Sequence, residues 1–350
     1  MRVKLEDVCE RGSSNIKQSD IIKMSGNYPI YGASGLAGKV NFYHQEQPYV
    51  AVVKDGAGIG RTTLNPAKSS VIGTMQYLIP KKNVLPEYLF YVVSYMHLEK
   101  YYTGATIPHI YFKDYKNEEF NLDNIEKQLE IIDVLGRCKK VIEARKQELV
   151  ELDSLTKARF VEMFGDPIQN PKGWDMPLIE EVVANEKNAL KAGPFGSALK
   201  KEYYVASGYK IYGQEQVISG DCTFGDYYID EERYKSLENC AVQPGDVLIS
   251  LVGTYGKLLI MPEVFEPGII NPRLMKITFD KEKVNPYYFK FFFQSESLKK
   301  ALSQNTHGGT MDILNLGIVR KIEMPLPPLK LQNEFVDFVH QVNKSANLKK

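Results

Sequence analysis

The chain carries an internal repeat, and this repeat constrains its architecture more than any other feature of the sequence. Residues 104–107 (Gly-Ala-Thr-Ile) match residues 308–311 (Gly-Gly-Thr-Met), a shift of 204 positions. At the same shift, residues 128–133 (Gln-Leu-Glu-Ile-Ile-Asp) match residues 332–337 (Gln-Asn-Glu-Phe-Val-Asp). Further upstream the shift drifts, as insertions in loops would cause. We therefore predict two copies of one structural plan, each a globular unit followed by a helix.

The segment from residue 124 to residue 163 has the periodicity of an amphipathic helix, because its apolar residues recur at steps of three and four. About 40 helical residues span roughly 60 Å, which is long for a globular domain and favours a coiled-coil pairing. The natural partner is the second copy of this helix, which starts after Pro327-Pro328. By the repeat shift Lys350 corresponds to Lys146, so the second helix lacks the counterpart of the last turns of the first. Either the chain is naturally short here or it has been trimmed.

The two globular units have the patterns of mixed, strand-rich domains, so we predict an α+β fold. Residues 50–53 and 246–251 are short apolar runs closed by glycine turns, which is typical of buried strands. Residues 88–95 and 287–293 are rich in aromatic residues and follow a proline, which favours short helices. The predicted boundaries are 1–122 for the first unit, 123–166 for the central helix, 167–326 for the second unit and 327–350 for the shortened C-terminal helix.

Composition fits a soluble protein of two domains, since the chain has 350 residues, of which 43% are hydrophobic and 25% charged. The sequence has no run of about 18 or more apolar residues that would predict a transmembrane helix, and its N-terminus lacks the apolar core of a signal peptide. The four cysteines have the spacing of neither a zinc site nor a disulfide framework. We therefore expect free thiols and a cytoplasmic location, where disulfides are rare.

Net charge gives the chain no general affinity for nucleic acid. The formal net charge is +1. Residues 1–120 hold 14 Lys and Arg against 11 Asp and Glu, and residues 166–325 hold 18 against 21. Contact with a polyanion must therefore come from local patches or be helped by a basic partner.

Three patterns suggest enzymatic chemistry but fit a structural role better. Residues 56–60 (Gly-Ala-Gly-Ile-Gly) look like a phosphate cradle, yet no good helix start follows them, so a glycine-rich hairpin is the better interpretation. Residues 285–288 (Asn-Pro-Tyr-Tyr) resemble a motif of adenine methyltransferases, but a helix start explains both them and their counterpart at 85–88. The five histidines lack metal-ligand spacing. We predict neither a catalytic centre nor a metal site.

Polar and basic loop clusters occur in both units and are candidates for DNA contacts. Arg, Lys, Gln and Asn can pair with base edges in the major groove, while Gly, Ser and Thr let backbone amides approach phosphates. Any single cluster could equally be an exposed turn, so the repeated placement favours the set rather than each member. The predicted DNA-binding residues are Tyr31, Ser34, Lys54, Arg61, Thr62, Thr106 and His109 in the first unit, and Lys191, Ser197, Gln214, Gln216, Thr254, Tyr255, Lys257, Arg273, His307 and Thr310 in the second.

An ordered series of motifs in the second unit resembles the specificity subunits of Type I restriction–modification systems. The motifs are Gly-Pro-Phe-Gly-Ser-Ala-Leu-Lys (193–200), Tyr-Gly-Gln-Glu-Gln-Val (212–217), Gly-Asp-Val-Leu-Ile-Ser (245–250), Gly-Thr-Tyr-Gly-Lys (253–257) and Pro-Leu-Pro-Pro-Leu (325–329). The helix end at 159–167 also matches a common family pattern, and the first unit is similar but more divergent. One departure is Leu251-Val252, where many relatives have an arginine or a serine, and it weakens any role of this strand end in base contact.

The resemblance implies a division of labour between this chain and its partners. Each globular unit would be a target-recognition domain for one half of a bipartite site in double-stranded DNA. The long helices would form an antiparallel coiled coil with pseudo-twofold symmetry, which fixes the separation of the half-sites and docks methyltransferase subunits, and restriction subunits would then join. S-adenosylmethionine, ATP and magnesium would be bound by these partners, and this non-catalytic chain would bind no cofactor.

Two other classes of protein remain to be weighed. A fused methyltransferase or nuclease would need a cofactor loop and a complete catalytic motif, and the sequence contains neither. A coiled-coil adaptor with globular ends that bind protein or sugar would lack sequence-specific, salt-dependent binding of duplex DNA. In the specificity-subunit interpretation, half-sites one DNA turn apart lie about 34–36 Å apart, which a helix pair of this length could span. Because the two units have diverged, the half-sites should differ.

Overall fold

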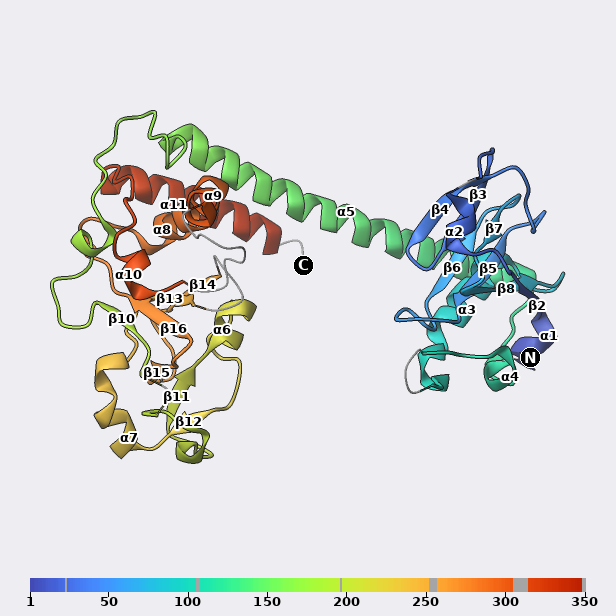
Figure 1. Ribbon diagram of the computed structural model, residues 1–350, viewed down its shortest axis with the longest axis horizontal. Coiled ribbons are helices and arrows are strands. Elements are labelled where there is room, and N and C mark those ends of the chain that lie inside the picture. Colours follow the sequence, from blue (N-terminus) through green and yellow to red (C-terminus); the bar gives the residue numbers. More distant parts are fainter. Residues whose placement is uncertain (23, 105–107, 196, 252–256, 305–313, 348–350) are drawn as a thin grey trace. The chain divides into compact units, whose positions relative to one another are not determined.

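A computed structural model shows two compact units, Met1–Arg145 (unit 1) and Lys146–Lys350 (unit 2), and the boundary between them falls inside helix α5 (Ile125–Phe164; Figure 1). The helix has 40 residues, which confirms the helix predicted from the apolar periodicity. Mixed sheets and helices make up both units, so the predicted α+β class is also confirmed. The structure describes residues 1–22, 24–104, 108–195, 197–251, 257–304 and 314–347.

Unit 1 is built on two small sheets. The larger sheet is antiparallel, with strand order β2-β8-β5-β6. The smaller sheet has the order β4-β3-β7, in which β3 pairs antiparallel with β4 and parallel with β7. The strands are β2 (Cys9–Ser13), β3 (Tyr28–Gly32), β4 (Gly35–Val40), β5 (Tyr49–Val53), β6 (Thr62–Asn65), β7 (Ser70–Val71) and β8 (Met75–Pro80), with a separate pair of β1 (Arg2–Lys4) and β9 (Glu119–Asn121). The short helices are α1 (Leu5–Val8), α2 (Gln18–Ile21), α3 (Pro86–Tyr95), η1 (Leu98–Tyr101) and α4 (Phe112–Tyr115).

Burial explains why β5 lies in the interior of unit 1. All five of its residues are buried, because both faces of the strand are covered. Val50 and Val52 pack with the hydrophobic cluster that includes Leu89 of α3, while the alternate residues pack with the cluster around Tyr77. This alternation follows from the period of two along a strand. The apolar run therefore reflects a strand with no solvent face.

Unit 2 repeats this topology with its own strands. Its larger sheet is antiparallel with order β10-β16-β13-β14, and its smaller sheet has the order β12-β11-β15, again with one antiparallel and one parallel pairing. The strands are β10 (Leu190–Ala192), β11 (Tyr209–Tyr212), β12 (Tyr228–Ile229), β13 (Val247–Ser250), β14 (Leu258–Ile260), β15 (Gly268–Ile270) and β16 (Leu274–Ile277). The helices are η2 (Ile179–Glu181), η3 (Lys201–Tyr203), α6 (Gln214–Ser219), α7 (Glu231–Ser236), η4 (Glu238–Cys240), α8 (Pro286–Phe293), α9 (Glu296–Gln304), α10 (Leu316–Val319) and α11 (Leu329–Asn347).

The repeat extends to single hydrogen bonds where each unit meets its own long helix. Gln128 of α5 accepts a hydrogen bond at its Oε1 from the backbone N–H of Leu85, at 2.9 Å, and Gln332 of α11 accepts one from the backbone N–H of Asn285, also at 2.9 Å. Both glutamine residues have 0% exposure. The amide nitrogen of each also donates to two backbone carbonyls, those of Asn83 and Asp123 in unit 1 and those of Lys283 and Pro327 in unit 2. We call this arrangement the glutamine junction, and it ties each helix to the start of α3 or α8.

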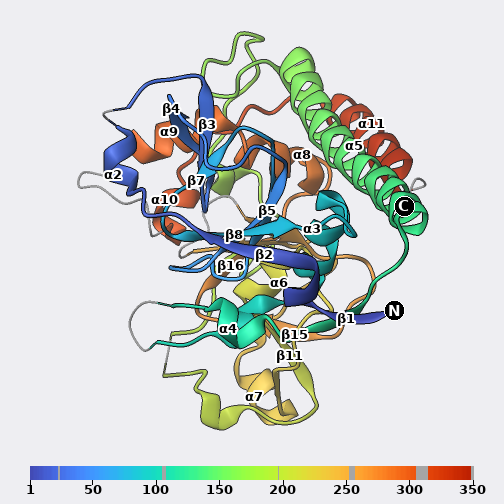
Figure 2. The ribbon, with the colours of Figure 1, turned by 90° about the vertical axis from the view of Figure 1, so that its right-hand side faces the viewer.

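Within unit 2, α11 runs antiparallel to the second half of α5, and the two helices lie side by side in both views (Figure 1, Figure 2). The ring of Phe160, near the end of α5, lies 5.4 Å from the ring of Phe335, near the start of α11. Leu152, earlier in α5, lines the same groove as Val342, later in α11. The predicted antiparallel pairing of the two helices is therefore confirmed for this part of α5.

Two motifs that look like enzyme signatures have structural roles in the described parts of the chain. Residues 56–60 lie in the connection of the antiparallel hairpin formed by β5 and β6, as predicted. Asn285 caps α8, because its Oδ1 accepts a hydrogen bond from the backbone N–H of Tyr287 at 2.9 Å. Among the described helices, none combines the length and the apolar character needed to cross a bilayer.

Candidate nucleic-acid interface

In unit 2, the ends of several strands from both sheets lie together at one edge of the sheets. Ser250, the last residue of β13, lies opposite Leu274, the first residue of β16, while β10 ends and β14 begins at the same level. In the smaller sheet, Tyr212 at the end of β11 pairs with Ile270 at the end of β15, and the next residues lead into β16. The loops that leave this place are therefore neighbours. We call them the unit 2 edge, which consists of residues 193–195, 197–200, 213–214, 251, 257 and 271–273.

Arg273 is held at this edge by hydrogen bonds on its backbone and its side chain. Its backbone N–H donates to Asn271 Oδ1 at 2.9 Å, and its carbonyl accepts from the N–H of Leu251 at 2.9 Å. Its guanidinium donates to Gln214 Oε1 at 3.4 Å. Gln214 in turn donates from Nε2 to the hydroxyl of Ser250 at 2.7 Å. The exposed guanidinium thus contacts a chain of two polar side chains, Gln214 at the start of α6 and Ser250 at the end of β13.

A glycine allows two of these loops to meet. A side chain at Gly193 would place its Cβ 1.9 Å from the carbonyl oxygen of Asn271, which is closer than two non-bonded heavy atoms can approach. The backbone N–H of Gly193 also donates to the carbonyl of Leu274 at 2.9 Å. Only glycine permits this backbone contact, so the loop that follows β10 packs directly against the turn that carries Arg273.

Unit 1 gathers its loops at the corresponding edge. Val53, the last residue of β5, lies opposite Met75, the first residue of β8, and β6 begins beside Val52. The smaller sheet ends at the same place, since the backbone N–H of Ile72 donates to the carbonyl of Tyr31 at 2.9 Å. We call these loops the unit 1 edge, which consists of residues 33–34, 54–61, 72–74, 103–104 and 108–110.

A carboxylate links two distant segments of the unit 1 edge. His109 Nδ1 lies 2.6 Å from Asp55 Oδ1, and Lys54 Nζ lies 3.8 Å from the other carboxylate oxygen. The backbone N–H of Ile110 donates to the carbonyl of Lys54 at 2.9 Å. These contacts place an imidazole and an ammonium group side by side at the edge.

Arg61 fixes a second part of the unit 1 edge. Its guanidinium donates from Nη1 to the carbonyl of Ala33 at 2.9 Å, so the turn between β3 and β4 is tied to the hairpin of β5 and β6. Arg61 is exposed, and among the described residues it has no carboxylate within ion-pair distance. Within the described parts of the chain, Arg273 likewise has no carboxylate at ion-pair distance, so each edge presents an exposed arginine of this kind.

The model of the Type I restriction modification DNA specificity domain matches residues 1–153 and 171–350 of the chain. The chain belongs to this family. Curated relatives agree: the Type I restriction enzyme MjaVIII specificity subunit of Methanocaldococcus jannaschii is 22% identical, over 94% of this chain and 82% of its own length. Specificity subunits have no catalytic centre, so the prediction that the chain is not an enzyme is confirmed.

Solved structures show that the fold of this specificity subunit is shared. The S subunit of a Type I restriction–modification system from M. genitalium superposes with a TM-score of 0.60 at 13% identity, covering 99% of this chain and 90% of that one. A chain from a structure that concerns complex assembly and conformational transition of the type I system has a TM-score of 0.57 at 16% identity, with 100% and 91% coverage.

The structure brings most of the predicted DNA-binding residues of the specificity subunit to the two edges or within two residues of them. Their contact with DNA stays a prediction. These residues are Tyr31, Ser34, Lys54, Arg61, Thr62 and His109 in unit 1, and Lys191, Ser197, Gln214, Lys257 and Arg273 in unit 2. Five others, Thr106, Thr254, Tyr255, His307 and Thr310, lie outside the described residues.

Gln216 requires a correction, because it is not available to a base. Its exposed fraction is 1%, and its amide is used inside unit 2. Its Oε1 accepts from the backbone N–H of Gly213 at 2.7 Å, and its Nε2 donates to the carbonyl of Phe224 at 2.7 Å. Gln216 therefore secures the start of α6, while Gln214 two residues earlier reaches the unit 2 edge.

Three residues that shape the edges were not among the predicted contacts. Ser250 accepts the hydrogen bond of Gln214, Asn271 fixes the turn of Arg273, and Asp55 holds His109. Asp55 follows the predicted contact Lys54, and Asn271 lies two residues before the predicted contact Arg273. Their positions in the sequence could therefore have indicated a role at the edges. Ser250 has 1% exposure and ends an apolar strand, so only the register of β13 with its neighbours shows its role.

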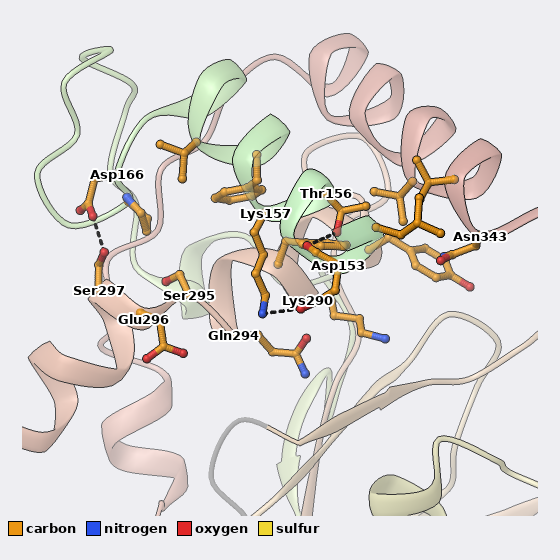
Figure 3. Close-up of a pocket in the computed structure, with 18 of the residues that line it drawn as sticks. Asp153, Thr156, Lys157, Asp166, Lys290, Gln294, Ser295, Glu296, Ser297 and Asn343 are labelled. Carbon is orange, nitrogen blue, oxygen red and sulfur yellow. Dashed lines mark hydrogen bonds and ion pairs between the residues drawn. The ribbon is translucent and has the colours of Figure 1, made fainter. Parts of the chain in front are cut away.

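A second surface of the specificity subunit is a groove of about 580 Å³ in unit 2, between α5, α8 and α11 (Figure 3). Leu149, Leu152 and Val342 give it apolar walls. Its rim is charged, with Lys157 paired to Asp153 at 2.7 Å. Lys290 also lines the groove. Burial, together with the charge of Lys257, lowers the pKa of Lys290. The groove thus combines an apolar surface with a charged rim.

Proposed function

We propose that the two edges read the two halves of a bipartite site in double-stranded DNA. The observation that carries this proposal is that one edge of the same fold gathers loop donors in both units. Unit 1 offers Lys54 and Arg61 there, and unit 2 offers Lys257 and Arg273. Arginine and lysine at loop ends can contact base edges and phosphates, which fits the family's role.

The two half-sites should differ, because the arginine residues come from loops that are not equivalent in the repeat. Arg61 precedes β6, the fourth strand of its sheet, whereas Arg273 precedes β16, whose counterpart in unit 1 is β8. The two units therefore have the same fold but carry their arginine guanidinium groups at different positions of the edge. Two different base patterns follow from one fold.

The helix pair is the second part of the proposal. We infer that α5 and α11 dock methyltransferase subunits, and that restriction subunits join the resulting complex. The apolar surface and charged rim of the groove suit an amphipathic helix of such a partner. S-adenosylmethionine, ATP and magnesium would be bound by the partner subunits, and the complex would act on DNA in the cytoplasm.

The test is a map of adenine methylation across the genome of cells that express the chain together with a methyltransferase subunit of its system. A split motif with a fixed gap, absent when the chain is absent, is the expected result. Replacing residues 1–122 with those of another family member should then change one half of the motif only.

A stable complex that adds no new motif would argue for the other interpretation, an adaptor whose globular units bind protein or sugar. Binding of the purified chain to random duplexes would separate the two, because an adaptor should bind DNA neither specifically nor with salt dependence.

A further inference from the structure

We propose that Arg273 determines the specificity of unit 2 by reading a guanine in its half-site, and that Ser250 and Gln214 position it for this task. The inference rests on the proposed function and adds the base and the residue that reads it. Arginine pairs with guanine because its planar fork of donors matches the O6 and N7 acceptors in the major groove.

The place of Arg273 in the fold distinguishes it from the other cation of the unit 2 edge. Its turn precedes β16, an inner strand of the sheet, and is flanked by the loop after β10 and by Leu251 after β13. Lys257 precedes β14, which is the outer strand. If this edge enters a groove of DNA, we infer that an inner position faces the middle of the groove and an outer position faces its phosphate border. The geometry therefore points to base contact for Arg273 and phosphate contact for Lys257.

Preorganisation supports the same assignment. The backbone of Arg273 is fixed on both sides, at 2.9 Å to Asn271 Oδ1 and at 2.9 Å to the N–H of Leu251. A long side chain that is already oriented loses less conformational freedom on binding. A phosphate contact needs no such precision, since a phosphate can be approached from many directions, whereas a base edge requires a defined orientation.

Gln214 is a positioning residue in this arrangement. A free glutamine could pair with adenine, but here Oε1 accepts from Arg273 at 3.4 Å and Nε2 donates to Ser250 at 2.7 Å. Both ends of its amide are engaged. Ser250 has 1% exposure and sits at the end of a buried strand, so it anchors the chain of bonds to the core. Among the described residues, Arg273 has no carboxylate within ion-pair distance, so its charge stays available to DNA.

The experiment measures the affinity of the full chain for three kinds of duplex. The first carries the split motif that the adenine-methylation map identifies. The others are duplexes with each base pair of the unit 2 half-site changed in turn, and a random duplex of equal length. The variants are Arg273→Ala, Arg273→Lys, Gln214→Leu and, as a matched control from the same edge, Lys257→Ala. Circular dichroism and thermal melting confirm that each variant folds.

Arg273→Ala should weaken binding to the cognate duplex by roughly 10- to 100-fold, leave binding to the random duplex unchanged, and abolish discrimination at one G·C pair. Arg273→Lys should restore affinity in part but not discrimination, because an ammonium lacks the planar fork. Gln214→Leu should reduce discrimination at that same base pair. Lys257→Ala should weaken binding to all duplexes alike and reduce the salt slope by about 0.9.

A uniform loss of affinity for Arg273→Ala, with discrimination kept at every base pair, would assign Arg273 to a phosphate and overturn the inference while leaving the proposed function intact. Unchanged binding by this variant would overturn the inference in the same way. A wild-type chain that binds all duplexes equally would instead refute the proposed function, and the inference with it.

Discussion

At the scale of single residues, the two edges use the same donor in different settings. Arg61 of unit 1 is tied to the carbonyl of Ala33, whereas Arg273 of unit 2 is tied to a glutamine side chain. Under the proposed function, Arg61→Ala should therefore affect only the half-site assigned to unit 1. We expect a loss of roughly 5- to 100-fold in affinity for the cognate duplex. The measurement is the affinity of wild type and variant for duplexes in which one half-site at a time is changed. If the variant lost discrimination at the other half-site, the prediction would be contradicted.

The cysteine residues differ sharply in their environments. All four are free thiols, and Cys138 on α5 is exposed. Burial raises the pKa of Cys9 to about 12, with a smaller opposing effect from the charge of Lys81, and burial also raises the pKa of Cys240. Since only the thiolate reacts and a raised pKa keeps the thiol protonated at pH 8, iodoacetamide should label Cys138 first and leave Cys9 unmodified.

Mass spectrometry of the digested chain gives this result directly, and a Cys138→Ser variant is the control that should lose the fast phase of labelling. Equal labelling rates for Cys9 and Cys138 in the folded chain would contradict the burial of Cys9 at the start of β2.

At the scale of elements, the glutamine junction joins each unit to its helix. Gln128→Leu or Gln332→Leu removes hydrogen bonds to buried backbone groups, which are then left without a partner. Each such group costs about 1–3 kcal/mol, so either variant should lower the free energy of unfolding by at least that amount. Gln147→Leu is the matched control, because Gln147 lies exposed on the same helix α5 and bonds only to Glu151, at 2.9 Å, among the contacts described.

Denaturation by urea, followed by circular dichroism, measures the difference. Variants that unfold at the same urea concentration as the Gln147→Leu control would show that the junction contributes nothing to stability. Because the junctions are equivalent, the two variants should have similar effects on their own units.

Much of this architecture follows from the sequence at the level of elements. The spacing of apolar residues indicated α5, and the shift of 204 residues indicated that Gln128 and Gln332 are equivalent. Local patterns could not indicate the order of strands in each sheet, since β11 pairs in parallel with β15 across more than fifty residues of chain. For the same reason the difference between Gln214 and Gln216 was hidden, because burial depends on which strands surround α6.

The site was predictable as a set of loops but not as a geometry. Arg273 was a candidate from its residue type and its neighbours Asn271 and Pro272, yet its orientation depends on Gln214, which lies 59 residues earlier. Such contacts arise only when the sheets bring distant loops to one edge. Residue type therefore indicates possible donors, and topology decides which of them can act together.

At the scale of the whole molecule, a net charge of +1 limits what the chain can do alone. Each phosphate neutralised by a cation adds about −0.9 to the slope of log K against log salt concentration. We expect the isolated chain to bind random duplexes weakly and with a shallow slope. A complex with the proposed methyltransferase partner should show a steeper slope, since further cations would contact the DNA backbone.

Fluorescence anisotropy at several salt concentrations, with and without the partner, measures both slopes. An isolated chain with a slope as steep as that of the complex would contradict this expectation and would mean that unit 1 and unit 2 supply the backbone contacts themselves.

The glutamine junction has a consequence for how such chains change over generations. Both units are fastened to their helices through the same side chain and the same kind of backbone groups. A recombination event with end points at the two glutamine junctions would replace one globular unit. The new unit would bond to its helix through the same glutamine. If the units read DNA as proposed, new targets would then arise by exchange of whole segments between genes.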